Sequence, residues 1–225
     1  PSKLGKIDSL NFKVDGLKAK VEFIGGGYEI CKITLLKPLG TGNKIDISTS
    51  FRVYLPEVFS RMGHQGQLYC VTQWFPKPAV FDVNGWNPMS YLDQGEFYSE
   101  FGKFDVSITV PKDYVLAATG NLEQQEEKKW WLQRTRSANV PHPSKASTKT
   151  LRFVQDSVHD FAWFASKDFK VAKSEVKLKS GKMVDTWLFV EDDNKGKLLE
   201  GTEHINTAIS FYSDKVGEYP YQHEI

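Results

Sequence analysis

Residues 104–111 read FDVSITVP, a run in which apolar and polar side chains alternate strictly. Successive side chains of a strand point to opposite faces, so this alternation predicts a strand with one apolar face. The same period-2 pattern occurs in residues 17–23 and 45–55. Clusters of glycine and asparagine separate these runs and are typical of turns. The sequence therefore predicts a mainly β fold, with antiparallel strands in a saddle-like or sandwich-like arrangement.

The sequence up to residue 192 continues to indicate strands. Residues 123–129 form a polar stretch, and Trp130 and Trp131 follow it. We interpret this segment as part of a hairpin whose loop contains Pro141 and Pro143. Residues 180–182 read SGK and are expected to form a hairpin turn. Further strands are expected at residues 151–154, 161–165, 171–178 and 184–190.

One amphipathic helix is expected near the C-terminus, at residues 195–217, and it is the only strong helix signal in the chain. Gly217 and Pro220 are the expected stop signals. Because this helix would need a partner surface, we expect part of its apolar face to be exposed in this chain. That face is expected to contain Leu198, Ile205, Ala208, Ile209, Tyr212 and Val216.

The composition is that of a globular chain with little net charge. The sequence has 225 residues, of which 40% are hydrophobic, and a net charge of +1. No basic run is interleaved with aromatic residues, so a nucleic-acid partner is not expected. No apolar run approaches the roughly 20 residues that cross a bilayer, so we expect a soluble protein without a membrane span. The N-terminal residues form no apolar signal segment, which leaves open a cytosolic protein or an exported one, periplasmic or extracellular, whose targeting peptide lies outside the sequence.

Cys31 and Cys70 are the only cysteines. Two isolated thiols form neither a disulfide framework nor the C-x-x-C spacing of a zinc site. We expect both to pack as small apolar residues, with a single disulfide as the alternative in an exported protein.

Residues 223–225 read HEI, the first letters of the H-E-x-x-H zinc motif. That motif requires a helix, whereas the preceding Pro220 favours an extended approach. No metal ligand is therefore assigned to His223 or Glu224. The remaining histidines are expected to be solvated or capping groups: His64, His142, His159 and His204.

Other signals of catalysis are weak. The carboxylate pairs Glu126-Glu127 and Asp192-Asp193 lie in polar stretches with lysines and are expected to be solvated. No serine lies in a G-x-S-x-G elbow, so serine hydrolysis has no support. Residues 74–104 are dense in aromatic side chains, which we interpret mainly as core packing, with a sugar-facing or peptide-facing platform as the alternative. No residue of this chain is assigned a catalytic role.

Several segments together resemble one known family. They include Thr72-Gln73-Trp74-Phe75-Pro76, YLDQGEF at 91–97, AATG at 117–120, VHDFAWFASKDF at 158–169 and ISFYSDKVGEYPY at 209–221. In this order they are similar to the N-terminal domain of the aminopeptidase N family of zinc metallopeptidases, most strongly to bacterial members. The similarity covers most of residues 68–221.

The resemblance implies a domain organisation and an activity for a longer protein. Residues 1–192 would form a non-catalytic β-domain, trimmed at its start, and residues 193–225 would begin the thermolysin-like catalytic domain. The family's H-E-x-x-H motif and the further glutamate ligand are not in this sequence. The intact parent would bind zinc and hydrolyse peptides from the N-terminus, whereas this chain alone would be inactive, carry no metal and require the catalytic domain as its partner.

One functional residue is implied by the resemblance. Gln73 matches a family glutamine that lies at the mouth of the active site and helps bind the N-terminal end of the substrate. Phe75 departs from the pattern, since an acidic residue often stands there to hold the α-ammonium group, and a phenyl ring cannot accept that hydrogen bond.

Two alternative functions are considered beside the peptidase. The parent could be an aminopeptidase-like protein that has lost its zinc ligands and serves as a scaffold for protein interaction. The chain could also be a stand-alone β-sandwich that binds carbohydrate or peptide through the aromatic residues 74–91.

Overall fold

The computed structural model describes residues 5–57, 61–90, 92, 94–95, 97–191 and 198–225. The chain forms two compact units, which are described separately below. Unit 1 contains Pro1–Pro56 and Trp74–Phe101, and unit 2 contains Glu57–Gln73 and Gly102–Ile225. Most of the regular structure is antiparallel sheet, which confirms the predicted mainly β class.

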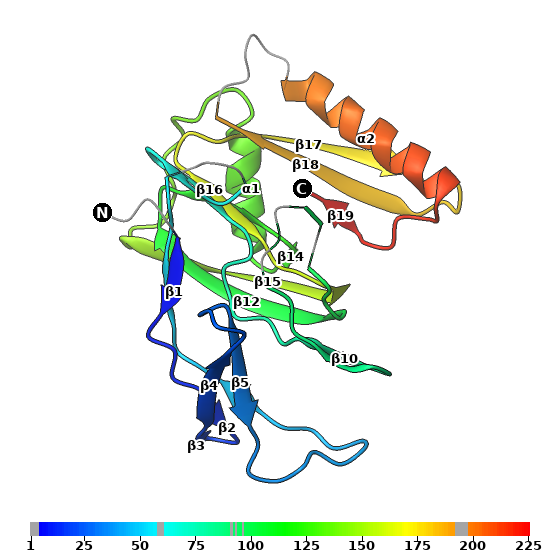
Figure 1. Cartoon of the computed structure of the whole chain (residues 1–225). Coiled ribbons are helices and arrows are strands. Elements are labelled where there is room, and N and C mark those ends of the chain that lie inside the picture. The colour runs from blue at the N-terminus through cyan, green and yellow to red at the C-terminus, as the bar shows by residue number, and fades with distance from the viewer. Residues whose placement is uncertain (1–4, 58–60, 91, 93, 96, 192–197) are drawn as a thin grey trace. The chain divides into compact units, whose positions relative to one another are not determined.

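Unit 1 consists of small sheets of two or three short strands (Figure 1). Its described apolar core is small, with Phe12, Val14 and Val80 as its fully buried members. The strands pair as β1 (Lys6–Asp8) with β7 (Arg52–Tyr54), β4 (Lys20–Ile24) with β5 (Ile30–Thr34), β10 (Val80–Asp82) with β11 (Gly85–Asn87), and β3 (Leu17–Lys18) with β2 (Lys13–Val14) and β6 (Ile47–Ser48).

Two strand predictions in unit 1 are only partly correct. Residues 17–23 divide into β3 and β4, and every residue of β4 is exposed, so the predicted buried face is wrong. Residues 45–55 likewise divide into β6 and β7, because β6 pairs with β2 whereas β7 pairs with β1. A two-stranded sheet such as β4 with β5 cannot bury a face until another layer covers it.

Unit 2 contains three larger sheets and both helices (Figure 1). Its core is rich in aromatic residues, with Trp130, Trp131, Phe153 and Phe161 almost completely buried. The first sheet has the order β13 (Val115–Ala118), β16 (Trp163–Ser166), β9 (Leu68–Val71) and β8 (Gly63–Gln65); the second β12 (Gly102–Pro111), β15 (Thr148–Val158) and β14 (Asn121–Leu122); the third β17 (Lys170–Lys177), β18 (Met183–Val190) and β19 (His223–Glu224).

The later strand predictions are confirmed within unit 2. The alternating residues 104–110 lie in β12, which pairs along its length with β15. Residues 180–182 form the predicted turn between β17 and β18, where Gly181 has a φ of +92°. A positive φ is unfavourable for residues with a side chain, which explains glycine at this position.

The hairpin predicted at residues 123–131 is wrong, because this segment begins a second helix. Helix α1 spans Gln125–Gln133. Glu127, Trp130, Trp131 and Arg134 are buried and recur at the spacing of one helical face. Charged residues and glutamine are good helix formers, so the polar stretch itself favours a helix.

The C-terminal helix is confirmed, and its apolar face is partly buried and partly exposed. Helix α2 spans Leu198–Lys215 and packs on β17 and β18. Ile209 is buried against Val176 and Val184, whereas Tyr212 is 60% exposed. Ala208 and Val216 are also exposed, so part of the apolar face is exposed, as expected.

Asn206 attaches α2 to β17 and β18 by polar contacts. Its side-chain amide accepts a hydrogen bond from Thr186 Oγ1 at 2.7 Å and donates one to Ser174 Oγ at 2.9 Å. A partly buried polar contact of this kind is satisfied only in one orientation of the helix.

In the described part of the chain no helix is long and apolar enough to cross a membrane.

Candidate functional site

Gln73 is the last residue of the first segment of unit 2, and Thr72 separates it from β9. Its backbone has a φ of +52°, in the left-handed region that side chains other than glycine rarely adopt. Thr72 Oγ1 donates a hydrogen bond to the Arg61 carbonyl oxygen at 3.2 Å and so holds the chain beside it. Among the described residues, the Gln73 side-chain amide has no hydrogen-bond partner.

Phe75 begins the second segment of unit 1 together with Trp74. The two rings pack edge to face with centroids 5.4 Å apart. The Lys77 ammonium lies 5.7 Å from the centroid of the Phe75 ring and 5.6 Å from that of Phe97. Phe75 is thus part of an aromatic cluster that holds a cation, a contact that a ring provides through its π face.

The aromatic residues at 74–104 are predicted to be mainly core, but several of them are exposed. Val80 is buried, but Phe81 and Trp86 of the β10 and β11 hairpin are 64% and 67% exposed. Their rings pack edge to face at 5.1 Å on the outside of this two-stranded sheet. Tyr98 and Phe101 are also exposed.

His223 and Glu224 form strand β19 instead of a helix, as predicted from Pro220. Their side chains already have partners: His223 Nε2 donates to the Gly120 carbonyl oxygen at 2.6 Å, and Glu224 accepts a hydrogen bond from the Tyr219 hydroxyl. The described residues contain no group of three or more histidines, cysteines or acids that could hold a metal. Zinc therefore has no fitting site in this part of the chain.

The two cysteines are free and half-buried. Burial raises the pKa of both thiols, so Cys31 and Cys70 are held in the protonated form at neutral pH. They lie in different units, Cys31 in β5 and Cys70 in β9.

Glu127 lies in a buried polar network, so the prediction that the pair Glu126-Glu127 is solvated is wrong for Glu127. Its carboxylate accepts hydrogen bonds from Trp131 Nε1 at 3.1 Å and from the ammonium of Lys149. The second carboxylate oxygen lies 3.0 Å from His142 Nε2. The other predicted pair, Asp192-Asp193, lies outside the described residues.

His142 also differs from the solvated group that we predicted. Its Nδ1 accepts a hydrogen bond from the Ser144 backbone N–H at 3.1 Å, so the ring proton lies on Nε2, which donates to Glu127. Burial lowers the pKa of Lys149, and the Glu127 carboxylate opposes that shift. The network is fully satisfied and joins α1 to the segment before β15.

Arg134 completes the attachment of α1. Its guanidinium donates hydrogen bonds to three backbone carbonyl groups, those of Phe169 at 3.0 Å, Val140 at 3.1 Å and Lys167. It also lies over the Trp130 ring, 4.8 Å from the centroid. The planar group, with several fixed donors, suits such a role, which we regard as structural.

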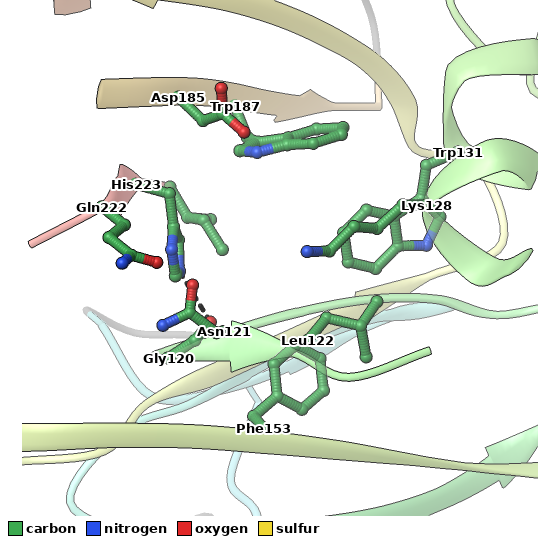
Figure 2. Close-up of a pocket in the computed structure, with 11 residues that line it drawn as sticks. Gly120, Asn121, Leu122, Lys128, Trp131, Phe153, Asp185, Trp187, Gln222 and His223 are labelled. Carbon is green, nitrogen blue, oxygen red and sulfur yellow. Dashed lines mark hydrogen bonds between the residues drawn. The ribbon is translucent and has the colours of Figure 1, made fainter. Parts of the chain in front are cut away.

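One pocket of about 150 Å³ lies within unit 2, where α1 faces β14, β18 and β19 (Figure 2). Its apolar floor is formed by Leu122, Trp131 and Phe153, all of which are almost completely buried. Its polar rim contains Asn121, Lys128, Asp185, Gln222 and His223, with Trp187 beside them.

The charged groups at and beside this rim are two ammonium groups and two carboxylates. Lys173 pairs with Asp185 Oδ1 at 2.8 Å and with Glu175 Oε1 at 3.0 Å. Lys128 makes no hydrogen bond or ion pair with a described side chain, and Figure 2 shows its ammonium group directed across the pocket toward His223. Burial lowers the pKa of Lys128, although Asp185 acts in the opposite direction. Burial likewise lowers the pKa of His223, so its ring is neutral at pH 7.

Sequence reasoning did not find these groups. The predicted hairpin contains Lys128 and Trp131. A hairpin lacks the helical spacing by which both residues line one pocket. The i, i+3, i+4, i+7 pattern of Glu127, Trp130, Trp131 and Arg134 was the available signal. The parallel pairing of β18 with β19, which brings His223 to Asp185, has no such local signal.

The fold is similar to that of solved zinc metallopeptidases. The chain matches an M1 zinc metallopeptidase from Deinococcus radiodurans with a TM-score of 0.60, a mutant of that enzyme bound to a Tyr-Ser-Ala substrate with 0.61, and a two-domain M1 zinc metallopeptidase mutant bound to L-arginine with 0.60. The sequence identity is 16% in each case. No family model and no curated protein matches the chain.

These similarities extend over 97% of this chain and 45% of each solved chain, so the sequence spans less than half the length of those proteins. At 16% identity the match establishes a common fold. It agrees with the family resemblance drawn from the sequence segments between residues 68 and 221.

Proposed function

We propose that this chain is the non-catalytic N-terminal part of a longer zinc metallo-aminopeptidase that hydrolyses peptides from their N-terminus. The observation that carries the proposal is the structural match to M1 zinc metallopeptidases. It covers 97% of this chain and 45% of the length of each solved chain. The ordered sequence similarity supports it independently, because it rests on motifs and not on backbone shape. In this proposal residues 1–192 form the β-domain and residues 193–225 begin the catalytic domain.

The chain would limit access to the active site and present Gln73 to the substrate. Two observations support a role for Gln73: its side-chain amide has no partner among the described residues, and its backbone has the unfavourable φ of +52°. Strained backbone of this kind persists where the surrounding structure enforces it, often at functional positions. The carboxamide can accept a hydrogen bond from a substrate ammonium and donate one to a substrate carbonyl group.

Zinc would be held by the part of the polypeptide that follows this chain, since the described residues offer no group of ligands. When bound there, zinc would supply Lewis-acid catalysis of peptide hydrolysis. The substrate class is a peptide with a free amino group. Its recognition cannot use a carboxylate at Phe75, so we expect another residue to bind the ammonium group.

The test is peptidase activity of a polypeptide extended by about 300 residues beyond Ile225, since a further catalytic domain needs that order of length. A peptide with a free N-terminus and its N-acetylated counterpart would be compared as substrates. We expect the extended protein to cleave only the free peptide and the 225-residue chain to cleave neither. Gln73→Ala in the extended protein should raise KM more than it lowers kcat, because a binding contact is lost.

Two other results would redirect the proposal. An extended protein that folds but cleaves neither peptide would favour an aminopeptidase-like scaffold for protein interaction. Binding of glycan or peptide by the 225-residue chain, abolished by Trp86→Ala, would instead favour a β-sandwich binding module, since Trp86 is 67% exposed.

A further inference from the structure

Strand β12 forms an edge of its sheet in the described part of unit 2. The sheet has the order β12, β15, β14, so β12 has a neighbouring strand on one side only among the described residues. It is ten residues long, and its outer edge presents a row of backbone N–H and C=O groups that can pair with another strand. We propose that this edge pairs with the same edge of a second copy of this chain, in a two-fold symmetric dimer.

The burial of the two paired strands indicates that the apolar face extends to this edge. On β15, Leu151 and Phe153 are almost completely buried, with exposed fractions of 2% and 0%. On β12, Ile108 and Val106 lie directly opposite them and are only half-buried. Because burial decreases from β15 to β12, a further strand beside β12 would cover apolar surface that is now in contact with water.

The two ends of β12 carry features that hinder pairing at an edge, whereas its middle does not. The register with β15 shifts at the start of β12, and Pro111 ends the strand without an N–H group. Irregular pairing and proline are two ways in which natural proteins protect an edge strand. Residues 104–110 contain no proline and pair with β15 in one continuous register. The unprotected part of the edge is therefore residues 104–110, and its midpoint is Ser107.

This segment is complementary to itself when two copies run antiparallel. In the symmetric arrangement, Ser107 lies opposite Ser107 of the second copy, and residues 104–110 of both copies are paired. The flanking pairs match apolar with apolar and polar with polar side chains: Val106 with Ile108, Phe104 with Val110, and Asp105 with Thr109. Directly opposite side chains share one face of a sheet, so the apolar rows of the two copies would join.

The charged groups near this edge do not oppose a second copy. Arg152 donates to both carboxylate oxygens of Asp105 at 2.7 and 2.6 Å, and it lies 3.6 Å from Glu123. Lys103 is a second positive charge near Asp105. Two charges of each sign leave this group without net charge. Like charges directly opposite each other are unfavourable, and the register centred on Ser107 avoids them because Asp105 faces Thr109 of the second copy.

The test is disulfide crosslinking at the symmetry axis, in the 225-residue chain and in the extended protein. Ser107→Cys would place two thiols directly opposite each other, with Cα atoms about 5 Å apart, a distance that a disulfide can bridge. Thr109→Cys is the matched control, because its two copies would lie four residues apart along the strands, about 14 Å, and cannot be bridged. After mild oxidation we expect a covalent dimer with Ser107→Cys only. The unmodified protein, which contains Cys31 and Cys70, gives the baseline.

Sedimentation velocity over a range of concentrations measures the same association without a covalent bond. Ser107→Asp should weaken the dimer about fivefold, because two carboxylates would lie opposite each other at the axis. Within one copy Ser107 lies opposite Arg152, which favours a carboxylate, so this variant should remain folded. Thr148→Asp is the matched control and should leave the association unchanged, since Thr148 is exposed at the start of β15 and not on the edge strand.

A covalent dimer of Ser107→Cys in both proteins, together with weaker association of Ser107→Asp, would support the proposal. A protein that is monomeric at every concentration, or equal crosslinking of the two cysteine variants, would overturn it. Crosslinking of the 225-residue chain alone would also overturn it, because the rest of the extended protein would then cover the edge. Peptidase activity is measured separately, so failure of the dimer and failure of the peptidase proposal are distinguishable.

Discussion

Glu127 and Lys149 form a buried ion pair, with side chains only 3% and 7% exposed. The pair joins α1 to the beginning of β15, and His142 and Trp131 donate to the same carboxylate. Two charges removed from water are tolerated when each is paired and hydrogen-bonded, whereas the loss of one partner leaves the other buried and uncompensated.

Glu127→Gln should therefore destabilise the protein by about 3 kcal/mol, since the substitution leaves the Lys149 charge without its counterpart. The free energy of unfolding would be measured by denaturation in urea. The matched control is Glu126→Gln on the exposed side of the same helix, for which we expect a change of about 0.5 kcal/mol or less. Equal effects of the two variants would contradict the buried network.

The stability should depend on pH through His223. Burial lowers its pKa in the folded protein, so as the pH falls through about 6.5 the unfolded chain takes up a proton before the folded one does. The His223 contribution is therefore fully present above this pH and is lost as the pH falls toward the lower folded pKa. His223→Gln should flatten the decline between pH 7 and pH 5, measured by urea denaturation. A decline of the same slope in both proteins would be contrary to a neutral, buried His223.

Gly120 should not tolerate a side chain. Its φ is +100°, and a Cβ atom there would lie 3.1 Å from the backbone of Val154. We expect Gly120→Ala to destabilise the protein by about 2 kcal/mol or more in thermal or urea unfolding. Gly181→Ala is the control, because Gly181 has a similar φ of +92° but nothing within 4 Å. It should cost only the conformational strain, about 1 kcal/mol.

Gln73 should show opposite effects on stability and function. Gln73→Gly relieves the left-handed backbone and should leave the stability unchanged or raise it by up to about 1 kcal/mol. Gln73→Ala keeps the backbone strain and should not bring this gain. In the extended protein both variants should lose substrate affinity, measured as a higher KM. A fully active Gln73→Gly protein would remove Gln73 from the substrate-binding role.

The sequence pattern predicts the larger strands of unit 2 well because they alternate over many residues, as residues 104–110 do in β12. It fails for α1, where Trp130 and Trp131 carry the β preference of aromatic residues although their spacing with Glu127 is helical. Strand β4 is a different kind of failure. Its alternating pattern predicts an apolar face, but the pattern does not show whether another element covers that face, and every residue of β4 is exposed.

The two candidate sites also differ in how far the sequence predicts them. Gln73 could be proposed from a local motif, because its neighbours in the sequence carry the resemblance. The Lys128 pocket could not, since it depends on the long-range placement of α1 against β18 and β19. Two residues nearly a hundred positions apart, Lys128 and His223, face each other only after that pairing (Figure 2).

Metal content is the sharpest test of the proposal that this chain is part of a zinc metallopeptidase. Zinc would be measured by plasma mass spectrometry on the purified extended polypeptide and on the 225-residue chain. We predict about one zinc ion per extended polypeptide, as expected for a catalytic site with one metal, and none in the shorter chain. An extended, folded polypeptide that binds no zinc would contradict the account.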